Sequence, residues 1–371
     1  MKILFAGGGT AGHVTPAIAI AEIIKKKYPS AECIFAGRSG GDENGSIVNE
    51  GYKLYTLDVE GASRSLSPKN LRVLFKLFRA IRNARRLIKS IRPDVIIGTG
   101  GYVSLPVIIS GYRLGVPTLM HESNAYPGLV TRKIGKKCDA VMLGMEEARA
   151  HLTYTDNVVA VGNPTRSKFN TLKKTEARQK LGIKKGELLI VSFGGSGGAE
   201  KINDIIIEVM RSHTAKNNMI RHIHATGKRS YPKSEEYAPE LCRGKNGAKL
   251  VPYIDNMPEL LSAADISITR SGAMTLAELG CVDCAPILIP SPNVAANHQY
   301  MNAAAIERRG GAILIEEKAL TAELLISRLK ILEADPKARE RMCISKGSKS
   351  KEECEKKILK VIEETVMGVK T

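Results

Sequence analysis

Three segments of the chain repeat one design, in which a short apolar run is followed by closely spaced glycines and then by a helical pattern. They read FAGGGTAGH from residue 5, GTGGYVSLP from residue 98 and SFGGSGGAEK from residue 192. Such apolar runs are typical of strands buried on both faces of a parallel sheet. Glycine lets the backbone turn sharply and approach a ligand, and the helix start that follows offers N–H groups to an anion. The design therefore predicts an α/β chain whose glycine loops bind phosphate.

The predicted elements continue this alternation along the chain. We expect helices at residues 16–27 and 104–115, and strands at residues 2–6, 33–36, 93–98, 117–122, 139–144, 188–193, 264–269 and 285–290. The pattern restarts after GNPTR (residues 162–166), which we interpret as a hinge, and 371 residues are enough for two domains. The prediction is two doubly wound, Rossmann-like domains that face a cleft, with ligands beyond the carboxyl ends of the strands.

The composition restricts the partners. A formal net charge of +18 favours an anionic partner such as nucleic acid, acidic lipid or a phosphorylated substrate. No aromatic RNA-recognition pattern is present, which argues against nucleic acid. The single CxxC pair, Cys281 and Cys284, has no second pair or histidine at ligand spacing, so we expect reduced thiols and no metal site. A membrane-spanning helix needs about 18 consecutive apolar residues, and the sequence contains no such run.

The first glycine loop also matches the dinucleotide-binding pattern G-x-G-x-x-G at Gly7, Gly9 and Gly12. An NAD site needs an acidic residue at the end of the second strand to bind the ribose hydroxyls. That strand is followed here by Arg38, which suits an NADP phosphate better than NAD. His13 follows the last glycine directly, an unusual place for a polar ring unless it takes part in chemistry. We therefore favour a different diphosphate ligand.

Seven motifs occur in the order that is typical of one protein family. They are GGGTAGHVTPA, GTGGYVSLP, HESNAYPGLVTR, GNPTR, GGSGGAEKIND, RSGAMTLAEL and NHQYMNA. As an ordered set they resemble the MurG family, the bacterial N-acetylglucosaminyltransferases that convert lipid I to lipid II in peptidoglycan synthesis. The resemblance implies a GT-B fold without a cofactor. It implies that residues 1–163 bind the acceptor, that residues 164–345 bind UDP-GlcNAc, and that a C-terminal helix (346–371) packs back on the first domain.

The resemblance also implies roles for individual residues. Gly101 and Tyr102 are implied to bind the acceptor, Ile254 the uracil, Glu278 the ribose and Gln299 the GlcNAc. The implied UDP-GlcNAc ligands in full are Thr10, Ala11, Gly12, Asn124, Arg166, Ser196, Ile254, Ala273, Met274, Thr275, Leu276, Glu278 and Gln299. The chain departs from the family in two places. Ala11 stands where many members have glycine, and the loop before Gln299 is less charged than expected, which leaves Asn297 and His298 without a clear role.

The implied reaction is attack by the C4 hydroxyl of MurNAc on the anomeric carbon of GlcNAc, with inversion and departure of UDP. It needs a base for the hydroxyl proton and stabilisation of the charge on the leaving diphosphate. His13 is our candidate base because imidazole exchanges a proton near neutral pH. The alternative is a histidine that only hydrogen-bonds. Glu122 is a second candidate base, or else a residue that orients its neighbours. No Asp-x-Asp is present, so we expect activity without a tightly bound metal.

Residues 68–93 predict a helix that carries nine Lys and Arg residues and no Asp or Glu. Its apolar residues recur at helical spacing, at Leu71, Leu74, Phe75, Phe78 and Ile81. A solvated helix that buries this stripe is the simple interpretation. An apolar stripe with a cationic rim is also typical of helices that bind anionic lipid headgroups. We expect peripheral attachment to the cytoplasmic face of the membrane through Phe75, Phe78, Arg79, Arg82 and Arg86.

Two other classes of function stay open at this level. A UDP-sugar 2-epimerase has the same architecture but needs no lipid-binding helix, so the basic segment argues against it. A nucleic-acid-binding protein is suggested by the charge alone. Transfer of labelled GlcNAc to a lipid I analogue separates the three.

Overall fold

The computed structural model describes residues 1–41, 43–60, 69–167, 169, 172–195, 197–344 and 351–367. The chain divides into two compact units. The first comprises Met1–Ser167 together with Lys351–Thr371, and the second comprises Lys168–Ser350. The GNPTR segment, which we interpreted as a hinge, therefore falls at the end of the first unit.

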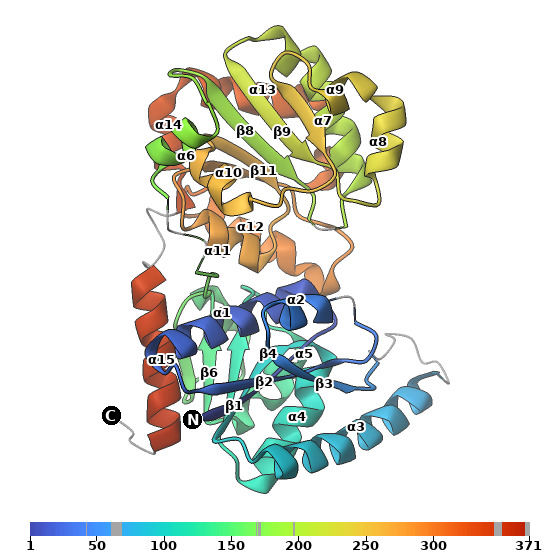
Figure 1. Ribbon diagram of the computed structural model, residues 1–371, viewed down its shortest axis with the longest axis vertical. Coiled ribbons are helices and arrows are strands. Elements are labelled where there is room, and N and C mark those ends of the chain that lie inside the picture. The colour runs from blue at the N-terminus through green and yellow to red at the C-terminus, as the bar shows by residue number, and fades with distance from the viewer. Residues whose placement is uncertain are drawn as a thin grey trace. The chain divides into compact units, whose positions relative to one another are not determined.

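The first unit is built on a parallel sheet whose strand order is β3-β2-β1-β4-β5-β6-β7 within the described residues (Figure 1). The strands are β1 (Lys2–Gly7), β2 (Glu32–Arg38), β3 (Lys53–Leu57), β4 (Val95–Gly100), β5 (Thr118–Glu122), β6 (Ala140–Leu143) and β7 (Val158–Ala160). The helices are α1 (Ala11–Lys27), α2 (Asn44–Asn49), α3 (Lys69–Ile91), α4 (Gly101–Leu114), α5 (Leu129–Ile134) and α15 (Lys351–Met367), with 3₁₀ turns at Gly135–Lys137 and Glu146–His151.

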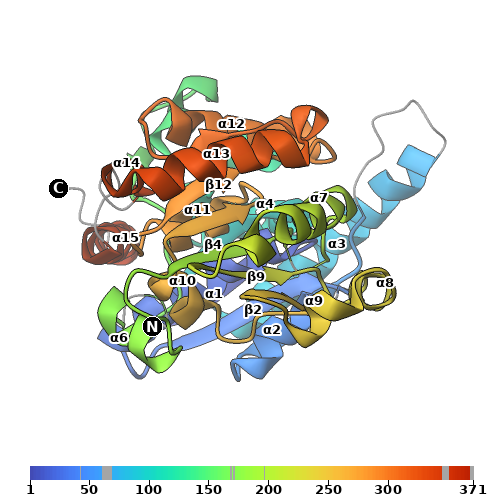
Figure 2. The ribbon, with the colours of Figure 1, turned by 90° about the horizontal axis from the view of Figure 1, so that it is seen from above.

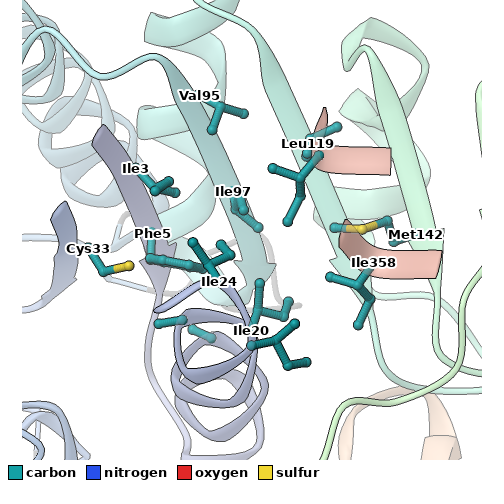
Figure 3. Packing of buried hydrophobic residues seen from close by; sticks show 14 of the residues in the cluster. Ile3, Phe5, Ile20, Ile24, Cys33, Val95, Ile97, Leu119, Met142 and Ile358 are labelled. Atoms are coloured by element: carbon teal, nitrogen blue, oxygen red, sulfur yellow. The ribbon is translucent and has the colours of Figure 1, made fainter. Parts of the chain in front are cut away.

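Helices cover both faces of this sheet. Successive residues of a strand point to opposite faces, so each strand contributes to two buried clusters. Ile3 and Phe5 of β1 belong to a buried cluster with residues of α1 and α15. The residue between them, Leu4, belongs to a second cluster with residues of α3 and α4. Figure 3 shows the first cluster, where Ile24 of α1 lies beside Phe5 and Ile358 of α15 lies beside Met142. The C-terminal helix thus completes the core of the first unit.

The second unit repeats the plan with a parallel sheet of order β10-β9-β8-β11-β12-β13 within the described residues. Its strands are β8 (Leu188–Phe193), β9 (Ile220–Ala225), β10 (Ala248–Val251), β11 (Ile266–Thr269), β12 (Ala285–Leu288) and β13 (Ile313–Leu314). Its helices are α6 (Lys174–Lys180), α7 (Glu200–Ser212), α8 (Tyr231–Tyr237), α9 (Pro239–Arg243), α10 (Met257–Ala263), α11 (Ala273–Leu279), α12 (His298–Glu307), α13 (Ala322–Ala334) and α14 (Pro336–Arg341). Short 3₁₀ turns lie at Thr214–Lys216, Ala295–Asn297 and Glu317–Ala319. Helices α6 and α10 pack side by side, and α7 contacts α13 (Figure 2).

The predicted strands and helices are present, with shifted ends. The helix predicted from residue 16 begins at Ala11, which leaves Pro16 inside α1. Proline has no N–H for the hydrogen bond to the residue four positions earlier, so it usually stands in the first turn. Other hydrogen bonds support the turn before Pro16: the His13 N–H donates to the Thr10 carbonyl at 3.1 Å, and the Thr99 hydroxyl donates to the His13 carbonyl.

The packing of α15 on the first unit gives a test of stability. Ile358 is 0% exposed and lies in the cluster that contains Ile24 and Met142. We expect Ile358→Ala to lower the free energy of unfolding by about 2–5 kcal/mol, because it leaves a cavity in a close-packed core. Urea unfolding followed by circular dichroism measures this change. Ile331→Ala is the matched control, because Ile331 is 51% exposed and its loss should cost less than about 0.5 kcal/mol. Equal effects of the two substitutions would contradict the packing.

Candidate functional site

The glycine loops that follow β1 and β4 are in contact, since the two strands are neighbours in the sheet. A Cβ atom on Gly101 would lie 2.0 Å from the carbonyl oxygen of Gly8, and one on Gly100 would lie 2.7 Å from Cδ2 of His13. Gly100 and Gly101 also have φ angles of 104° and 77°, which disfavour any side chain. Two motifs that are about 90 residues apart in the sequence therefore form one site around His13.

The imidazole of His13 is half-buried in the first turn of α1. Its Nδ1 lies 3.2 Å from the carbonyl oxygen of Gly8 and 3.1 Å from Oγ1 of Thr10. A carbonyl oxygen only accepts hydrogen bonds, so the contact with Gly8 fits a proton on Nδ1. In the neutral ring the lone pair is then on Nε2. The loop thus fixes the ring in an orientation in which Nε2 is the basic atom.

The first glycine loop binds a carboxylate of its own chain. The backbone N–H of Gly9 donates to Oε1 of Glu43 at 2.5 Å. Gly9 is the residue that needs a positive φ, of 91°, whereas Ala11 begins helix α1. The alanine at this family glycine position therefore has an ordinary helical backbone. The contact with Glu43 indicates that an N–H group of the loop is directed toward a negative charge.

Glu122 at the end of β5 is buried, with 6% of its surface exposed. One of its oxygens accepts from the backbone N–H and the side-chain amide of Asn124, at 3.0 and 3.2 Å. The other accepts from the N–H of Gly128 and the hydroxyl of Thr131, both at 2.8 Å. Four donors occupy the lone pairs of a carboxylate. Of the two roles considered for Glu122, this geometry favours orienting the loop that carries Asn124.

Arg166 is bound to the first unit. Its guanidinium forms ion pairs with Glu50 and, at 3.7 Å from Nε, with Glu22 of α1. Its carbonyl oxygen accepts a hydrogen bond of 3.2 Å from Lys351 at the start of α15. The segment expected to carry a donor ligand is therefore tied to α1 and to the C-terminal helix.

In the second unit the expected donor residues lie at the carboxyl edge of the sheet, except Ser196, which is outside the described residues. Ile254 follows β10 and is 8% exposed, beside Tyr253, whose ring lies 5.3 Å from Nζ of Lys228. In α11 the side chains of Ala273, Met274 and Leu276 are buried. Thr275 and Glu278 are half-exposed and stand three residues apart, on one face of the helix.

The loop before Gln299 has an unusual backbone. Ala296 and Asn297 both have left-handed φ angles, of 52° and 51°. Asn297 precedes the first residue of α12, and His298 makes a ring contact of 2.8 Å with the carbonyl oxygen of Ala295. The contact of its ring gives His298 a structural role, whereas Asn297 is distinguished by its left-handed backbone. Such strained backbone is often found at ligand-binding sites.

Sequence reasoning missed a buried polar network behind the second-unit glycine loop. The Ser192 hydroxyl lies 2.7 Å from Nε2 of His222 and 2.8 Å from Nδ1 of His224. Asn203 of α7 contacts Nε2 of His224 at 3.0 Å and donates to the carbonyl of Thr226 at 2.9 Å. Burial lowers the pKa of His224 to about 3, so the ring is neutral. The alternating histidines of IRHIHA in a strand were the available signal.

The network holds two glycine turns against each other. A Cβ atom on Gly198 would lie 2.2 Å from the carbonyl oxygen of Thr226, and one on Gly227 would lie 2.5 Å from the nitrogen of Gly198. The second unit therefore repeats the close loop contact of the first.

Helix α3 presents large apolar side chains to solvent. Phe75 and Phe78 are 71% and 65% exposed, whereas the core face of the helix is made by Ala80, Ala84 and Ile88. Arg79, Arg82, Arg85 and Arg86 are also exposed. Lys76 is neutralised by ion pairs with Asp58, at 3.1 Å, and Glu60. The side chains of Leu71 and Leu74 are outside the part that the structure describes.

Among the described residues, no group of three or more His, Cys, Asp and Glu side chains is arranged to hold a metal ion. The helices described in the structure include none with the length and apolar character needed to cross a membrane.

Solved structures agree with the fold. The crystal structure of MurG from Acinetobacter baumannii matches with a TM-score of 0.75 at 21% identity, over 98% of this chain and 99% of that one. A putative UDP-N-acetylglucosamine 2-epimerase from Listeria monocytogenes matches with a TM-score of 0.70 at 12% identity, over 100% and 97% of the two chains. Two parallel-sheet units thus form a GT-B fold, as predicted.

Sequence relatives are more specific than the fold. A protein of Thermoanaerobacter sp. (strain X514) is 40% identical over 363 residues, 98% of this chain and 99% of the relative. Its name is UDP-N-acetylglucosamine--N-acetylmuramyl-(pentapeptide) pyrophosphoryl-undecaprenol N-acetylglucosamine transferase. A protein of Carboxydothermus hydrogenoformans with the same name is 38% identical over 98% of this chain and 97% of its own length.

Two family models match the two halves of the chain. The glycosyltransferase family 28 N-terminal domain matches residues 3–143, and the C-terminal domain of the same family matches residues 189–360. The chain therefore belongs to glycosyltransferase family 28.

Proposed function

We propose that this chain transfers GlcNAc from UDP-GlcNAc to the C4 hydroxyl of the MurNAc unit of lipid I and forms lipid II with inversion at the anomeric carbon. The observation that carries the proposal is the likeness over 98% of the chain to transferases named for this reaction. The arrangement of His13 between two glycine loops supports it, because a base and an anion-binding backbone stand together.

The first unit binds the acceptor in this proposal. His13 Nε2 takes the proton of the attacking hydroxyl, and the hydrogen bond from Nδ1 to Gly8 stabilises the imidazolium that forms. Thr10, Ala11 and Gly12 lie next to the diphosphate, while Gly101 and Tyr102 contact the acceptor. Tyr102 is 48% exposed and available for such a contact. Glu122 orients the loop that carries Asn124.

The second unit binds the donor in this proposal. The backbone at Ile254 recognises uracil, and Glu278 with Thr275 binds the ribose and diphosphate. The buried Ala273, Met274 and Leu276 hold the start of α11 in place and contribute through the backbone. Gln299 binds the GlcNAc. Asn124 and Arg166 of the first unit are also donor ligands in this proposal, as are Thr10, Ala11 and Gly12. Ser196 is assigned from its motif alone.

Helix α3 attaches the protein to the cytoplasmic face of the membrane in this proposal. Phe75 and Phe78 enter the interface, and Arg79, Arg82 and Arg86 contact anionic headgroups. A lipid-linked acceptor gives a reason for this attachment, because the reacting sugar stays close to the bilayer. The exposure of both phenylalanines on an otherwise cationic face supports this role.

The function is tested by incubating the full chain with radiolabelled UDP-GlcNAc and a lipid I analogue. The proposal expects label in the lipid product and release of UDP. Conversion of UDP-GlcNAc to its 2-epimer without an acceptor, and no labelled lipid, would contradict it and identify an epimerase.

The proposed base is tested by His13→Ala. We expect turnover to fall by about 10²- to 10⁴-fold, the usual contribution of a general base. The affinity for UDP, measured by calorimetry, should not change, because the second unit is intact. His213→Ala is a matched control, since His213 is partly buried beside Glu333 in the second unit and has no role in the site. If His13→Ala kept wild-type turnover, His13 would not be the base.

The membrane surface is tested by reversing three charges on α3. The triple substitution Arg79→Glu, Arg82→Glu and Arg86→Glu should weaken binding to vesicles with anionic lipid by at least about 100-fold, from roughly 1 kcal/mol per basic residue. Binding of the wild-type chain should also weaken as salt is raised. Arg243→Glu, Lys245→Glu and Lys249→Glu provide the control, because these cations are exposed on the second unit. Vesicle binding that ignored both salt and the α3 charges would rule out the surface.

A further inference from the structure

One peptide unit of the second domain connects a buried charge to a proposed donor ligand. The carbonyl oxygen of Pro290 accepts a hydrogen bond of 3.0 Å from Nη1 of Arg270. The N–H of Ser291, which belongs to the same planar peptide unit, donates to Oε1 of Gln299 at 2.9 Å. A contact that fixes the plane of this peptide unit therefore also fixes the position of the side-chain amide of Gln299.

Arg270 lies where three parallel strands end side by side. It follows β11 directly, and its Nη1 also donates to the carbonyl of Ile289 at 3.2 Å, at the end of β12. Its Nη2 forms an ion pair with Glu317, just beyond β13. The two side chains are only 14% and 16% exposed. The guanidinium thus joins the carboxyl ends of β11, β12 and β13 at neighbouring positions.

The ion pair with Glu317 orients the guanidinium of Arg270. A planar guanidinium offers donors in a fixed fork, so a carboxylate at one end sets the direction of the N–H groups at the other. With the carboxylate at Nη2, the opposite nitrogen reaches the two carbonyls of Ile289 and Pro290. Because the pair is largely shielded from water, removal of the carboxylate would leave a poorly compensated cation that moves toward solvent.

The orientation of Gln299 follows from this chain of contacts. A backbone N–H needs an acceptor, so the amide oxygen must face Ser291 and the NH₂ group must point away from it. Two more hydrogen bonds hold the same segment to the loop before α11. The Ser271 hydroxyl donates to the carbonyl of Gln299 at 2.8 Å, and the Asn302 amide donates to the carbonyl of Ser271 at 3.1 Å.

We propose that Glu317 is a positioning residue that, through Arg270 and the peptide between Pro290 and Ser291, presents the NH₂ group of Gln299 as a hydrogen-bond donor to the sugar of the nucleotide donor. The inference rests on the proposed function, since it takes Gln299 as the ligand of that sugar. It adds that the side chain recognises the sugar by donating to a hydroxyl or acetamido oxygen. The affinity for UDP, which has no sugar beyond the ribose, does not depend on this chain of contacts.

The test compares the affinities of UDP-GlcNAc and UDP in one set of variants, by calorimetry on the full chain. In Glu317→Gln we expect the Kd for UDP-GlcNAc to rise by about 3- to 10-fold, the range for one weakened neutral hydrogen bond, and the Kd for UDP to stay the same. Arg270→Lys should act in the same direction, because lysine cannot reach two carbonyls and a carboxylate at once. Glu317→Asp keeps the charge and should recover most of the affinity.

The control removes a similar ion pair at the amino end of the strands, away from the proposed donor site. Glu187 precedes β8, is 8% exposed, and binds Nε of Arg221 at 3.0 Å. Glu187→Gln should lower stability and leave both affinities unchanged. The inference is overturned if Glu317→Gln leaves the ratio of the two Kd values unchanged, weakens UDP equally, or matches the control. A chain that transfers no GlcNAc to lipid I but shows the expected change of ratio would refute the proposed function and leave this inference standing.

Discussion

The site of the first unit depends on the contact between the glycine loops after β1 and β4. Parallel neighbours end at the same edge, so their loops compete for the same space. Here the space is shared because Gly100 and Gly101 have no side chains, and the carbonyl of Gly8 and the ring of His13 occupy the volume that Cβ atoms would fill. The carbonyl of Gly8 holds the ring of His13 within the first loop, and Gly100 and Gly101 let the second loop approach both groups closely.

In the second unit two glycine loops are also in close contact, and a buried polar network holds them together. Gly198 and Gly227 bring two loops together, and beneath them Ser192, His222, His224 and Asn203 form a fully buried polar network. Further along the same edge, a guanidinium and a carboxylate fix the loop of Gln299. In both units the loops that we propose to bind ligands are short, and polar contacts hold them in place.

The sequence predicted the parts of this structure that follow from local patterns. Apolar runs predicted the positions of strands such as β8, whose residues match the prediction, and the glycines predicted the positions of the loops. It did not predict β9, because His222 and His224 interrupt the apolar run and become buried only by pairing with Ser192. The motifs singled out Glu122, the last residue of β5, and Arg166, whose roles stay predictions. Thr131, a partner of Glu122, lies in the same motif as Glu122. Glu22 and Glu50, the partners of Arg166, lie far away in the sequence, so only the fold shows these pairs.

The central claim is that close contact of the β1 and β4 loops creates the acceptor side of a GlcNAc transferase. Gly101→Ala tests it most directly, because the added Cβ would lie 2.0 Å from the oxygen of Gly8. The measurement is the rate of GlcNAc transfer to a lipid I analogue, with UDP affinity measured on the same sample. We expect a loss of transfer of at least about 100-fold, the usual effect of misplacing reacting groups by about 1 Å, with unchanged UDP binding. Wild-type transfer by Gly101→Ala would contradict it.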